Sequence, residues 1–278
     1  MSDLQQALAE DEITHLYIQE YWTGRFDYLV RKCKIPVIGA DHGGKRYRQI
    51  CLFKEKSFKK AAALTCQSLL EAQEVKKFGC QPVVLPNGVD TDFFVPSNGV
   101  IVEKIVFTVA RLTDDQKRIS DLIKSFQFLP APWQLVIAGS GPDEQKLRKL
   151  TLEINLESRV TFLGFVRDRD ILRQYYQSCR VFALVSAHEG LPLAVLEAMS
   201  CGCPVVVSDI PAFYGLVENK IDGIKVRVGD IRGIAKGITL ADELRDKLFI
   251  ASRAKVEREF SRTEMSKKLV RLLETVRP

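Results

Sequence analysis

The chain has 278 residues, of which 46% are apolar and 27% charged, and its 41 Lys and Arg residues against 35 Asp and Glu residues give a formal charge of +6. This composition excludes disordered, collagen-like and coiled-coil chains, and at about 150 residues per domain the length predicts one large or two modest domains. No apolar stretch approaches the roughly 20 residues of a spanning helix, and the first residues lack the basic-then-apolar pattern of a signal peptide. We therefore expect a cytoplasmic protein.

The first 98 residues contain short apolar runs that alternate with helical patterns. We predict helices over 2–10, 26–33, 50–62 and 67–78, and strands over 13–18, 35–41, 61–65 and 82–86. The stretch 95–99 is typical of a linker, since it combines Pro, Ser, Asn and Gly.

The same alternation continues more clearly from residue 103. Strands are predicted over 105–110, 134–139, 159–164, 180–186, 204–209 and 223–228, with helical spacing between several of them and two basic helical segments over 240–259 and 263–276. The strands are continuous apolar runs, which indicates that helices cover both faces of a parallel sheet. The predicted fold is a doubly wound, parallel α/β domain.

The seven cysteines are odd in number and scattered, which argues against a disulfide framework. Cys201 and Cys203 form a C-x-C pair, but no second pair of ligands lies near enough in sequence to complete a zinc site. We expect buried thiols and no metal.

Ligands of open parallel sheets bind where strands end and helices begin, and the loop after the predicted strand 105–110 carries Arg111 and Lys117. A guanidinium can bind two phosphate oxygens and an ammonium adds a point charge, so this pair suits a diphosphate. The alternative is that both are surface cations paired with Asp114 or Asp115.

The loop Gly139, Ser140, Gly141 follows the predicted strand 134–139, and its glycines permit close approach of a nucleotide. A dinucleotide fingerprint needs a third glycine, which is missing. The alternative is a tight turn capped by Asp143.

The third loop carries Glu189 and, eight residues later, Glu197, with a helix predicted to begin near Pro192. At the helical rise, eight residues span roughly 12 Å, about the distance from sugar to ribose in an extended nucleotide sugar. Glu197 follows apolar residues on a helix expected to be buried, so it needs a partner such as ribose hydroxyls. The alternatives are an exposed glutamate on a capped helix and a glycosidase pair, whose carboxylates flank one bond at about 5–9.5 Å.

Five segments together resemble the retaining glycosyltransferases of family 4, which have the GT-B fold. They are LPNGVDTDFFVP (85–96), VARLTDDQKRISDLI (109–123), LVIAGSGPDEQKL (135–147), VTFLGFV (160–166) and VSAHEGLPLAVLEAMSCGCPVVVSDIP (185–211). The resemblance is weaker over THLYIQEYW (14–22) and IPVIGADHGG (35–44).

The resemblance implies a role for each matching residue. Arg111 and Lys117 would bind the donor diphosphate, Glu189 the transferred sugar, and Glu197 the ribose. His42 would face the donor sugar, although it stands in ADHGG rather than the commoner pattern. The base would lie near the loop Gly139, Ser140, Gly141. The sugar and phosphate would meet the available backbone N–H groups of a second loop, which is formed by Gly190, Leu191, Pro192 and Leu193.

The mechanism implied has no protein nucleophile, cofactor or metal. The acceptor hydroxyl attacks the face from which the nucleoside diphosphate leaves, and a phosphate oxygen takes its proton. The acceptor, a saccharide or a lipid-linked one, is not specified by the sequence.

The resemblance also implies three parts: a partial N-terminal, acceptor-side α/β domain over 1–98, a complete Rossmann-like donor domain over 99–262, and a C-terminal helix over 263–278 that crosses back. The glycine-rich loop of the family's first strands has no counterpart here. A partner chain supplying the missing part is therefore expected if the chain is incomplete.

Residues 25–60 contain eleven Lys or Arg and three Asp or Glu. Such a segment suits an anionic acceptor or peripheral contact with an anionic membrane, at the inner face, or is simply a solvated helix face. No nucleic-acid motif accompanies it.

The leading hypothesis is thus a nucleotide-sugar-dependent glycosyltransferase, in lipid-linked or cell-envelope glycan synthesis. The second is a noncatalytic or incomplete nucleotide-sugar-binding subunit. A nicotinamide dehydrogenase would need a glycine fingerprint after an early strand, and none is present.

Overall fold

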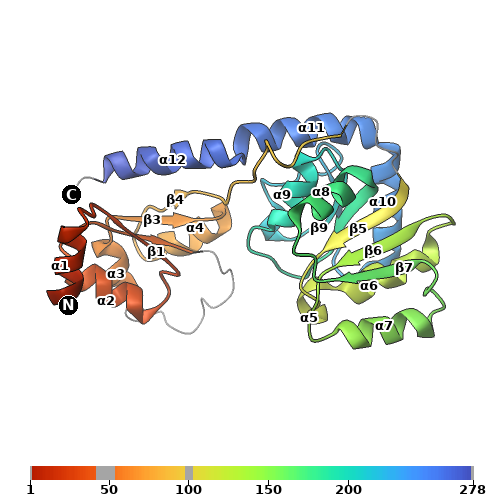
Figure 1. Cartoon of the computed structure of the whole chain (residues 1–278), viewed down its shortest axis with the longest axis horizontal. Coiled ribbons are helices and arrows are strands. Elements are labelled where there is room, and N and C mark those ends of the chain that lie inside the picture. Colours follow the sequence, from red (N-terminus) through yellow and green to blue (C-terminus); the bar gives the residue numbers. More distant parts are fainter. Residues whose placement is uncertain (1, 42–53, 98–102, 277–278) are drawn as a thin grey trace. The chain divides into compact units, whose positions relative to one another are not determined.

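The computed structural model describes residues 2–41, 54–97 and 103–276. The chain divides into two compact units, unit 1 with residues 1–88 and 263–278 and unit 2 with residues 89–262 (Figure 1). Each unit contains its own sheet, and all strand pairs in both sheets are parallel. Within the described residues, no helix has the length and apolar character needed to cross a membrane.

Unit 1 contains a four-stranded sheet in the order β1-β2-β3-β4. Its strands are β1 (Leu16–Gln19), β2 (Val37–Ala40), β3 (Ala63–Cys66) and β4 (Val83–Val84). Its helices are α1 (Ser2–Glu10), α2 (Gly24–Lys32), α3 (Lys54–Lys60), α4 (Leu69–Lys76) and most of α12 (Arg262–Thr275). The predicted alternation of strands and helices is confirmed, with strands shorter than the apolar runs that predicted them.

Helix α3 begins with a lysine that is not part of any basic surface. Lys54 is fully buried, and its ammonium donates to the carbonyl oxygens of Tyr21 (3.2 Å) and Thr23 (2.8 Å) and to the Asp27 carboxylate (2.8 Å). A buried charge needs such partners, because desolvation of an unpaired ammonium is very costly. Lys54 therefore joins α3 to α2, whereas Lys56, Lys59 and Lys60 are exposed.

Unit 2 contains a six-stranded sheet in the order β10-β9-β8-β5-β6-β7. Its strands are β5 (Glu103–Val109), β6 (Gln134–Ala138), β7 (Val160–Gly164), β8 (Cys179–Leu184), β9 (Val205–Ser208) and β10 (Ile224–Val226). Its helices are α5 (Asp114–Lys117), α6 (Ile119–Ser125), α7 (Glu144–Glu153), α8 (Arg169–Ser178), α9 (Leu193–Ser200), α10 (Ile231–Glu243) and α11 (Arg245–Glu259), with two 3-10 turns, η2 (Phe126–Phe128) and η3 (Pro211–Phe213).

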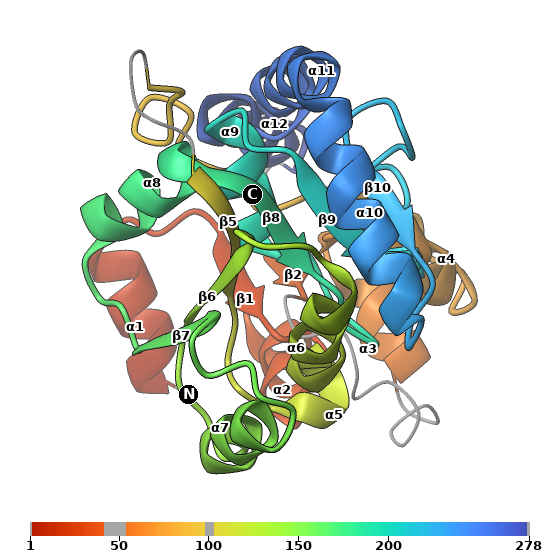
Figure 2. The same ribbon diagram turned by 90° about the vertical axis from the view of Figure 1, so that its right-hand side faces the viewer.

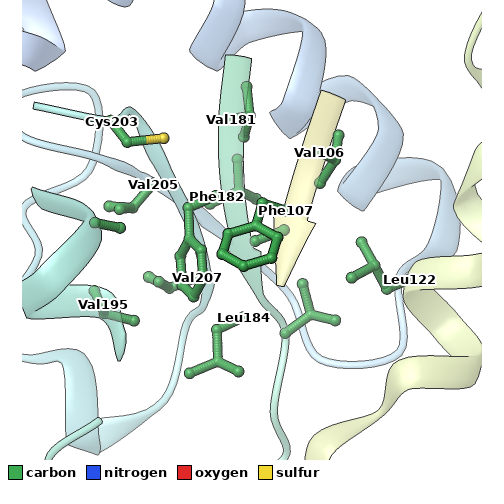
Figure 3. Packing of buried hydrophobic residues seen from close by; sticks show 14 of the residues in the cluster. Val106, Phe107, Leu122, Val181, Phe182, Leu184, Val195, Cys203, Val205 and Val207 are labelled. Carbon is green, nitrogen blue, oxygen red and sulfur yellow. The ribbon is translucent and has the colours of Figure 1, made fainter. Parts of the chain in front are cut away.

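Helices cover both faces of this sheet, as the apolar strands predict. Helices α6 and α10 pack on one face and α8 and α9 on the other (Figure 2). The central strands meet in one core, where Phe107 of β5 pairs with Phe182 of β8 in the register of the sheet (Figure 3). The doubly wound α/β prediction is confirmed.

The predicted helix over 240–259 is wrong in its bounds. Residues 231–243 form a separate helix, α10, and Leu244 separates it from α11. Gly233 and Gly237 weaken the helical signal in the sequence. Gly237 is explained by packing, because a Cβ atom there would lie 2.7 Å from Val226 Cγ1 of β10.

The segment 89–95 packs on unit 2, although the linker predicted for the domain boundary lies at 95–99. Arg253 of α11 donates to the carbonyl oxygens of Thr91 (3.1 Å), Phe94 (2.8 Å) and Ser200 (2.6 Å), and thereby holds this segment against α9 and α11. Residues 263–278 group with unit 1.

Candidate functional site

The order of strands in unit 2 reverses direction between β5 and β8, the position at which doubly wound sheets are expected to bind ligands. The chain leaves β5 for β6 and β7 on one side, and then returns to form β8 on the other side of β5. Loops that follow two such strands diverge, and ligands of doubly wound sheets bind in the gap at their carboxyl ends. The loop of Arg111 and Lys117 follows β5, and the loop of Glu189 follows β8.

These two loops are joined by an ion pair. The ammonium of Lys117, at the end of α5, lies 2.6 Å from Glu189 Oε1, and the side chains are only 16% and 6% exposed. The backbone also connects them, since the Ala187 N–H donates to the Gln116 carbonyl oxygen (2.8 Å). The alternative that Lys117 pairs with Asp114 or Asp115 is therefore wrong.

Arg111 lies exposed where β5 ends, and among the described residues its guanidinium has no ion pair. It lines a cavity of about 390 Å³ with apolar groups from β5, β6 and the loop after β7, and the lining also includes Gly139 and Ser140. Phe165, at the rim, is 75% exposed. The lining of this cavity therefore includes both an exposed aromatic ring and a cationic group.

The glycine loop is shaped by its own neighbours. A Cβ atom on Gly139, whose φ is +134°, would lie 1.8 Å from the Ala110 carbonyl oxygen, and one on Gly141 would lie 2.4 Å from the Leu112 carbonyl oxygen. The loops after β5 and β6 therefore approach each other too closely for any side chain. The same approach brings Ser140 beside the predicted phosphate loop, where its carbonyl oxygen accepts from the Leu112 N–H (3.0 Å).

The alternative interpretation of this turn requires Asp143 to cap its own helix, α7, and Asp143 does not do so. Its Oδ2 accepts from the backbone N–H of Asp114 at 2.7 Å, and no side-chain capping bond forms at the start of α7. Asp114 Oδ1 in turn accepts from the Ser120 N–H (2.8 Å). These carboxylates fix the short helix that carries Lys117.

The glutamate loop, 189–193, leads into α9, which begins at Leu193 with Pro192 as the preceding residue. The helical rise applies only from Leu193 onward, because residues 189–192 are not helical, so the estimate of roughly 12 Å between Glu189 and Glu197 stays a prediction. The N–H groups of Gly190 and Leu191 donate to no acceptor within the described parts of the chain. Free N–H groups in a loop before a helix suit an anionic or hydroxyl-bearing ligand.

Glu197 lies half-buried on α9, and its partner within the protein is a tyrosine. The Tyr176 hydroxyl donates to Glu197 Oε2 at 3.0 Å. Burial raises the pKa of Glu197, while the Tyr176 hydrogen bond and the Arg169 charge oppose that rise. The alternative of an exposed glutamate is wrong.

Glu189 has a second partner besides Lys117. The hydroxyl of Ser186, which is fully buried, donates to Glu189 Oε1 at 2.6 Å. Tyr176 and Ser186 are the contacts that sequence reasoning missed. The apolar spacing indicates that Tyr176, in α8, and Ser186, after β8, are buried. The sequence does not indicate which glutamate each hydroxyl contacts.

His42 lies outside the described residues. Within the described residues, no three His, Cys, Asp or Glu side chains gather as a metal site, and all six described cysteines are free thiols. Cys201 and Cys203 are buried, and the Cys203 thiol lies 3.2 Å from that of Cys179. A larger cavity, of about 680 Å³, lies between α11 and the 214–225 loop and contains none of the predicted site residues.

The family model "Glycosyl transferases group 1" matches residues 95–255, more than half of the chain. The chain belongs to this family. It is 30% identical over 189 residues to an uncharacterized glycosyltransferase of Haemophilus influenzae, covering 64% of this chain and 52% of that protein. It is 33% identical over 164 residues to the Escherichia coli UDP-Gal:alpha-D-GlcNAc-diphosphoundecaprenol alpha-1,3-galactosyltransferase, covering 53% of this chain and 42% of that protein. The chain thus spans about half the length of these relatives.

Solved structures agree with the fold of this group 1 chain. Anabaena HepE in complex with UDP superposes with a TM-score of 0.83 at 19% identity, over 99% of this chain and 81% of that one. Sucrose-phosphate synthase from Thermosynechococcus elongatus gives 0.82 at 22% identity, over 99% and 76%. The predicted GT-B fold, with Rossmann-like α/β units and parallel sheets, is confirmed.

Proposed function

We propose that the chain is a retaining glycosyltransferase of family 4, which moves a sugar from a nucleoside-diphosphate sugar to an acceptor hydroxyl. The observation that carries the proposal is the Lys117–Glu189 ion pair, which joins the segments that follow β5 and β8, with the exposed Arg111 in the same segment as Lys117. In this ion pair, a cation suited to phosphate and a carboxylate suited to sugar hydroxyl groups lie at hydrogen-bonding distance from each other.

The proposed mechanism uses positioning and electrostatics. Arg111 and Lys117 would bind the diphosphate and balance the charge that develops on it as the sugar bond breaks, so the proposal includes no metal. The loop 190–193 would meet the sugar and phosphate through its N–H groups, with Glu189 on the sugar and Glu197 on the ribose. The base would lie in the cavity beside Gly139–Ser140–Gly141 and Phe165. The acceptor hydroxyl would attack from the side on which the diphosphate leaves, and a phosphate oxygen would accept its proton.

Cell-envelope glycan synthesis is the context that the relatives favour. The Escherichia coli relative is named for a diphosphoundecaprenol substrate, and a Salmonella typhimurium relative, 29% identical over 227 residues, is a putative colanic acid biosynthesis glycosyltransferase. A lipid-linked acceptor would bring the chain to a membrane. The exposed basic residues of α2 and α3, together with Lys34 shortly after α2, would suit anionic headgroups; they are Arg25, Arg31, Lys32, Lys34, Lys56, Lys59 and Lys60.

A second candidate is a noncatalytic donor-binding subunit that needs a partner chain for transfer. The observation in its favour is that all the described residues proposed to bind the donor lie in unit 2. Unit 2 could therefore bind the donor without contributing any acceptor site. Turnover by the isolated chain would reject this candidate, and donor binding without turnover would support it.

The test is calorimetry with UDP, GDP and ADP, followed by hydrolysis and transfer assays with the matching sugar nucleotides. We expect Arg111→Ala or Lys117→Ala to lower donor-dependent turnover at least about tenfold, because each removes one charge-assisted contact to the leaving group. Arg148→Ala and Lys149→Ala are matched controls, since both side chains are exposed on α7. Turnover like that of the unmodified protein in both site variants would refute the assignment.

A further inference from the structure

Each glutamate of the proposed donor site has one carboxylate oxygen fixed by a buried hydroxyl. Ser186 Oγ donates to Glu189 Oε1, and the Tyr176 hydroxyl donates to Glu197 Oε2. We infer that Tyr176 and Ser186 are positioning residues, which orient these two carboxylates so that the second oxygen of each is available to the donor. The inference rests on the proposed function and adds two residues to it.

The remaining oxygens of the two glutamates fit this role. Within the described part of the chain, Glu189 Oε2 and Glu197 Oε1 receive no hydrogen bond. A glutamate side chain loses rotamer freedom when it is ordered, and a site that orders it beforehand does not lose that freedom again when ligand binds. One oxygen held by the protein and one left for ligand is the arrangement expected of a preorganised contact.

Tyr176 is itself rigidly placed. Its ring is 1% exposed and contacts the rings of Phe94, Phe107 and Phe182, with centroids 5.9, 5.3 and 5.5 Å away. Burial raises the pKa of Tyr176 well above its ordinary value, so its hydroxyl keeps its proton and can only donate to the carboxylate. The core of unit 2 therefore fixes the direction from which Glu197 is held.

Ser186 is placed differently but as firmly. It is fully buried two residues after β8, and its hydroxyl and the Lys117 ammonium converge on the same oxygen of Glu189. When Lys117 turns toward a diphosphate, Ser186 still holds that oxygen. The hydroxyl thus lets the cation change partners without releasing the carboxylate.

The two residues should affect different steps. Glu197 is proposed to bind the ribose, which every nucleoside diphosphate carries, so Tyr176 should act on UDP binding. Glu189 is proposed to bind the transferred sugar, which UDP lacks, so Ser186 should act on the turnover of UDP-glucose.

The test for Tyr176 is Tyr176→Phe, with Tyr175→Phe as its control. Tyr175 is the neighbouring residue of α8, and its ring stacks on Phe107 (4.9 Å, 18°). The Tyr176 hydrogen bond lowers the pKa of Glu197. Its loss should therefore raise that pKa further, so that the carboxylate takes up a proton at higher pH. We expect the calorimetric affinity for UDP to fall about tenfold, and the loss to grow as the pH is lowered, because in the variant Glu197 takes up a proton at higher pH than in the unmodified protein. A loss that does not change with pH is the result of a merely structural role and would overturn the inference.

The test for Ser186 is Ser186→Ala, with Ser208→Ala as its control. Ser208 is also fully buried at the end of a strand, β9, but its hydroxyl has no hydrogen-bond partner among the described residues. We expect Ser186→Ala to lower the turnover of UDP-glucose about tenfold with the affinity for UDP within about twofold, since a misdirected carboxylate affects only the sugar. A loss of UDP affinity as large as the loss of turnover would overturn the inference.

A third measurement needs no ligand. The carboxyl signals of the full chain labelled with ¹³C-glutamate can be followed against pH, with Glu197→Gln to assign the signal. Tyr176→Phe should move the midpoint of the Glu197 signal to higher pH, and an unchanged midpoint would overturn the inference even if UDP binds. Failure of the unmodified chain to bind UDP, GDP or ADP, with the midpoint shifted as expected, would refute the proposed function and leave the hydroxyl–carboxylate coupling established.

Discussion

The Lys117–Glu189 pair predicts a specific pattern of stability in unit 2. Lys117→Met removes the cation and leaves Glu189, at 6% exposure, with Ser186 as its remaining partner. Lys117→Met together with Glu189→Gln removes both charges, while the amide can still accept from Ser186. We therefore expect the double variant to be more stable than the single Lys117→Met variant.

The magnitude follows from the burial of the pair. Removing one partner of a buried ion pair costs about 3–5 kcal/mol, because the other charge stays desolvated. The lysine is 16% exposed, so water reaches part of the pair and the lower end, about 3 kcal/mol, is expected for Lys117→Met. Without the charge, the double variant should lose only about 1 kcal/mol, the usual net value of one hydrogen bond.

The assay is urea unfolding followed by the fluorescence of Trp133, which lies in the core of unit 2, in a Trp22→Phe background that silences unit 1. If the double variant loses as much free energy of unfolding as the two single variants together, the charges are not coupled and the reasoning is refuted. The same variants separate folding from function. Glu189→Gln should restore stability to Lys117→Met without restoring turnover, since the proposed phosphate contact is still missing.

Two further predictions concern single positions. Burial, with the Asp41 charge in addition, raises the pKa of Glu71 from 4.5 to about 7, so the folded state binds a proton more tightly than the unfolded chain and the stability of unit 1 falls as the pH rises through this window. At pH 8, the free energy of unfolding of Glu71→Gln should therefore exceed that of the unmodified protein by up to about 3 kcal/mol, and at pH 4.5 the two should be almost equal. The measurement is urea unfolding followed by Trp22 fluorescence in a Trp133→Phe background, with the more exposed Glu74→Gln as the control. An equal difference at both pH values would contradict this prediction. Gly139→Ala should lower the melting temperature of unit 2 and abolish UDP binding, because its Cβ would lie 1.8 Å from the Ala110 carbonyl oxygen at a φ of +134°; an alanine variant that melts with the unmodified protein would refute this.

Most strands and helices could be predicted because their signals are local. The six apolar runs of unit 2 each became a strand, since continuous β-branched residues serve a strand that is covered on both faces. Helix α10 was missed for an equally physical reason. Gly233 and Gly237 lower the helix propensity of this segment, and α10 is stabilised by close packing on β10. Such packing between distant segments cannot be predicted from the local sequence.

The candidate site shows the same division between local and long-range signals. Arg111, Lys117 and Glu189 could be selected because they lie in the segments that follow predicted strands, and ligands of parallel sheets bind at the carboxyl ends of strands. Lys117 contacts Glu189, 72 residues away, because β8 lies beside β5 in the sheet. The residues of these two segments do not indicate the order of the strands, so the contact could not be predicted from them. Asp143 is a clearer failure, because its position suggests a cap for α7 and its carboxylate caps α5 instead.

The strand order also explains why two buried hydroxyls accompany the glutamates. Helix α8 leads directly into β8, so the residues that end α8 and follow β8 lie at opposite ends of one strand. Tyr176 enters the core from the first end and reaches α9, while Ser186 stands at the second end beside α5. A single strand with its two flanks thus fixes one oxygen of each carboxylate, and any change that shifts β8 against β5 should disturb both glutamates together. The core pairing of Phe107 with Phe182 resists that shift, so the packing of the sheet and the geometry of the proposed donor site depend on the same residues.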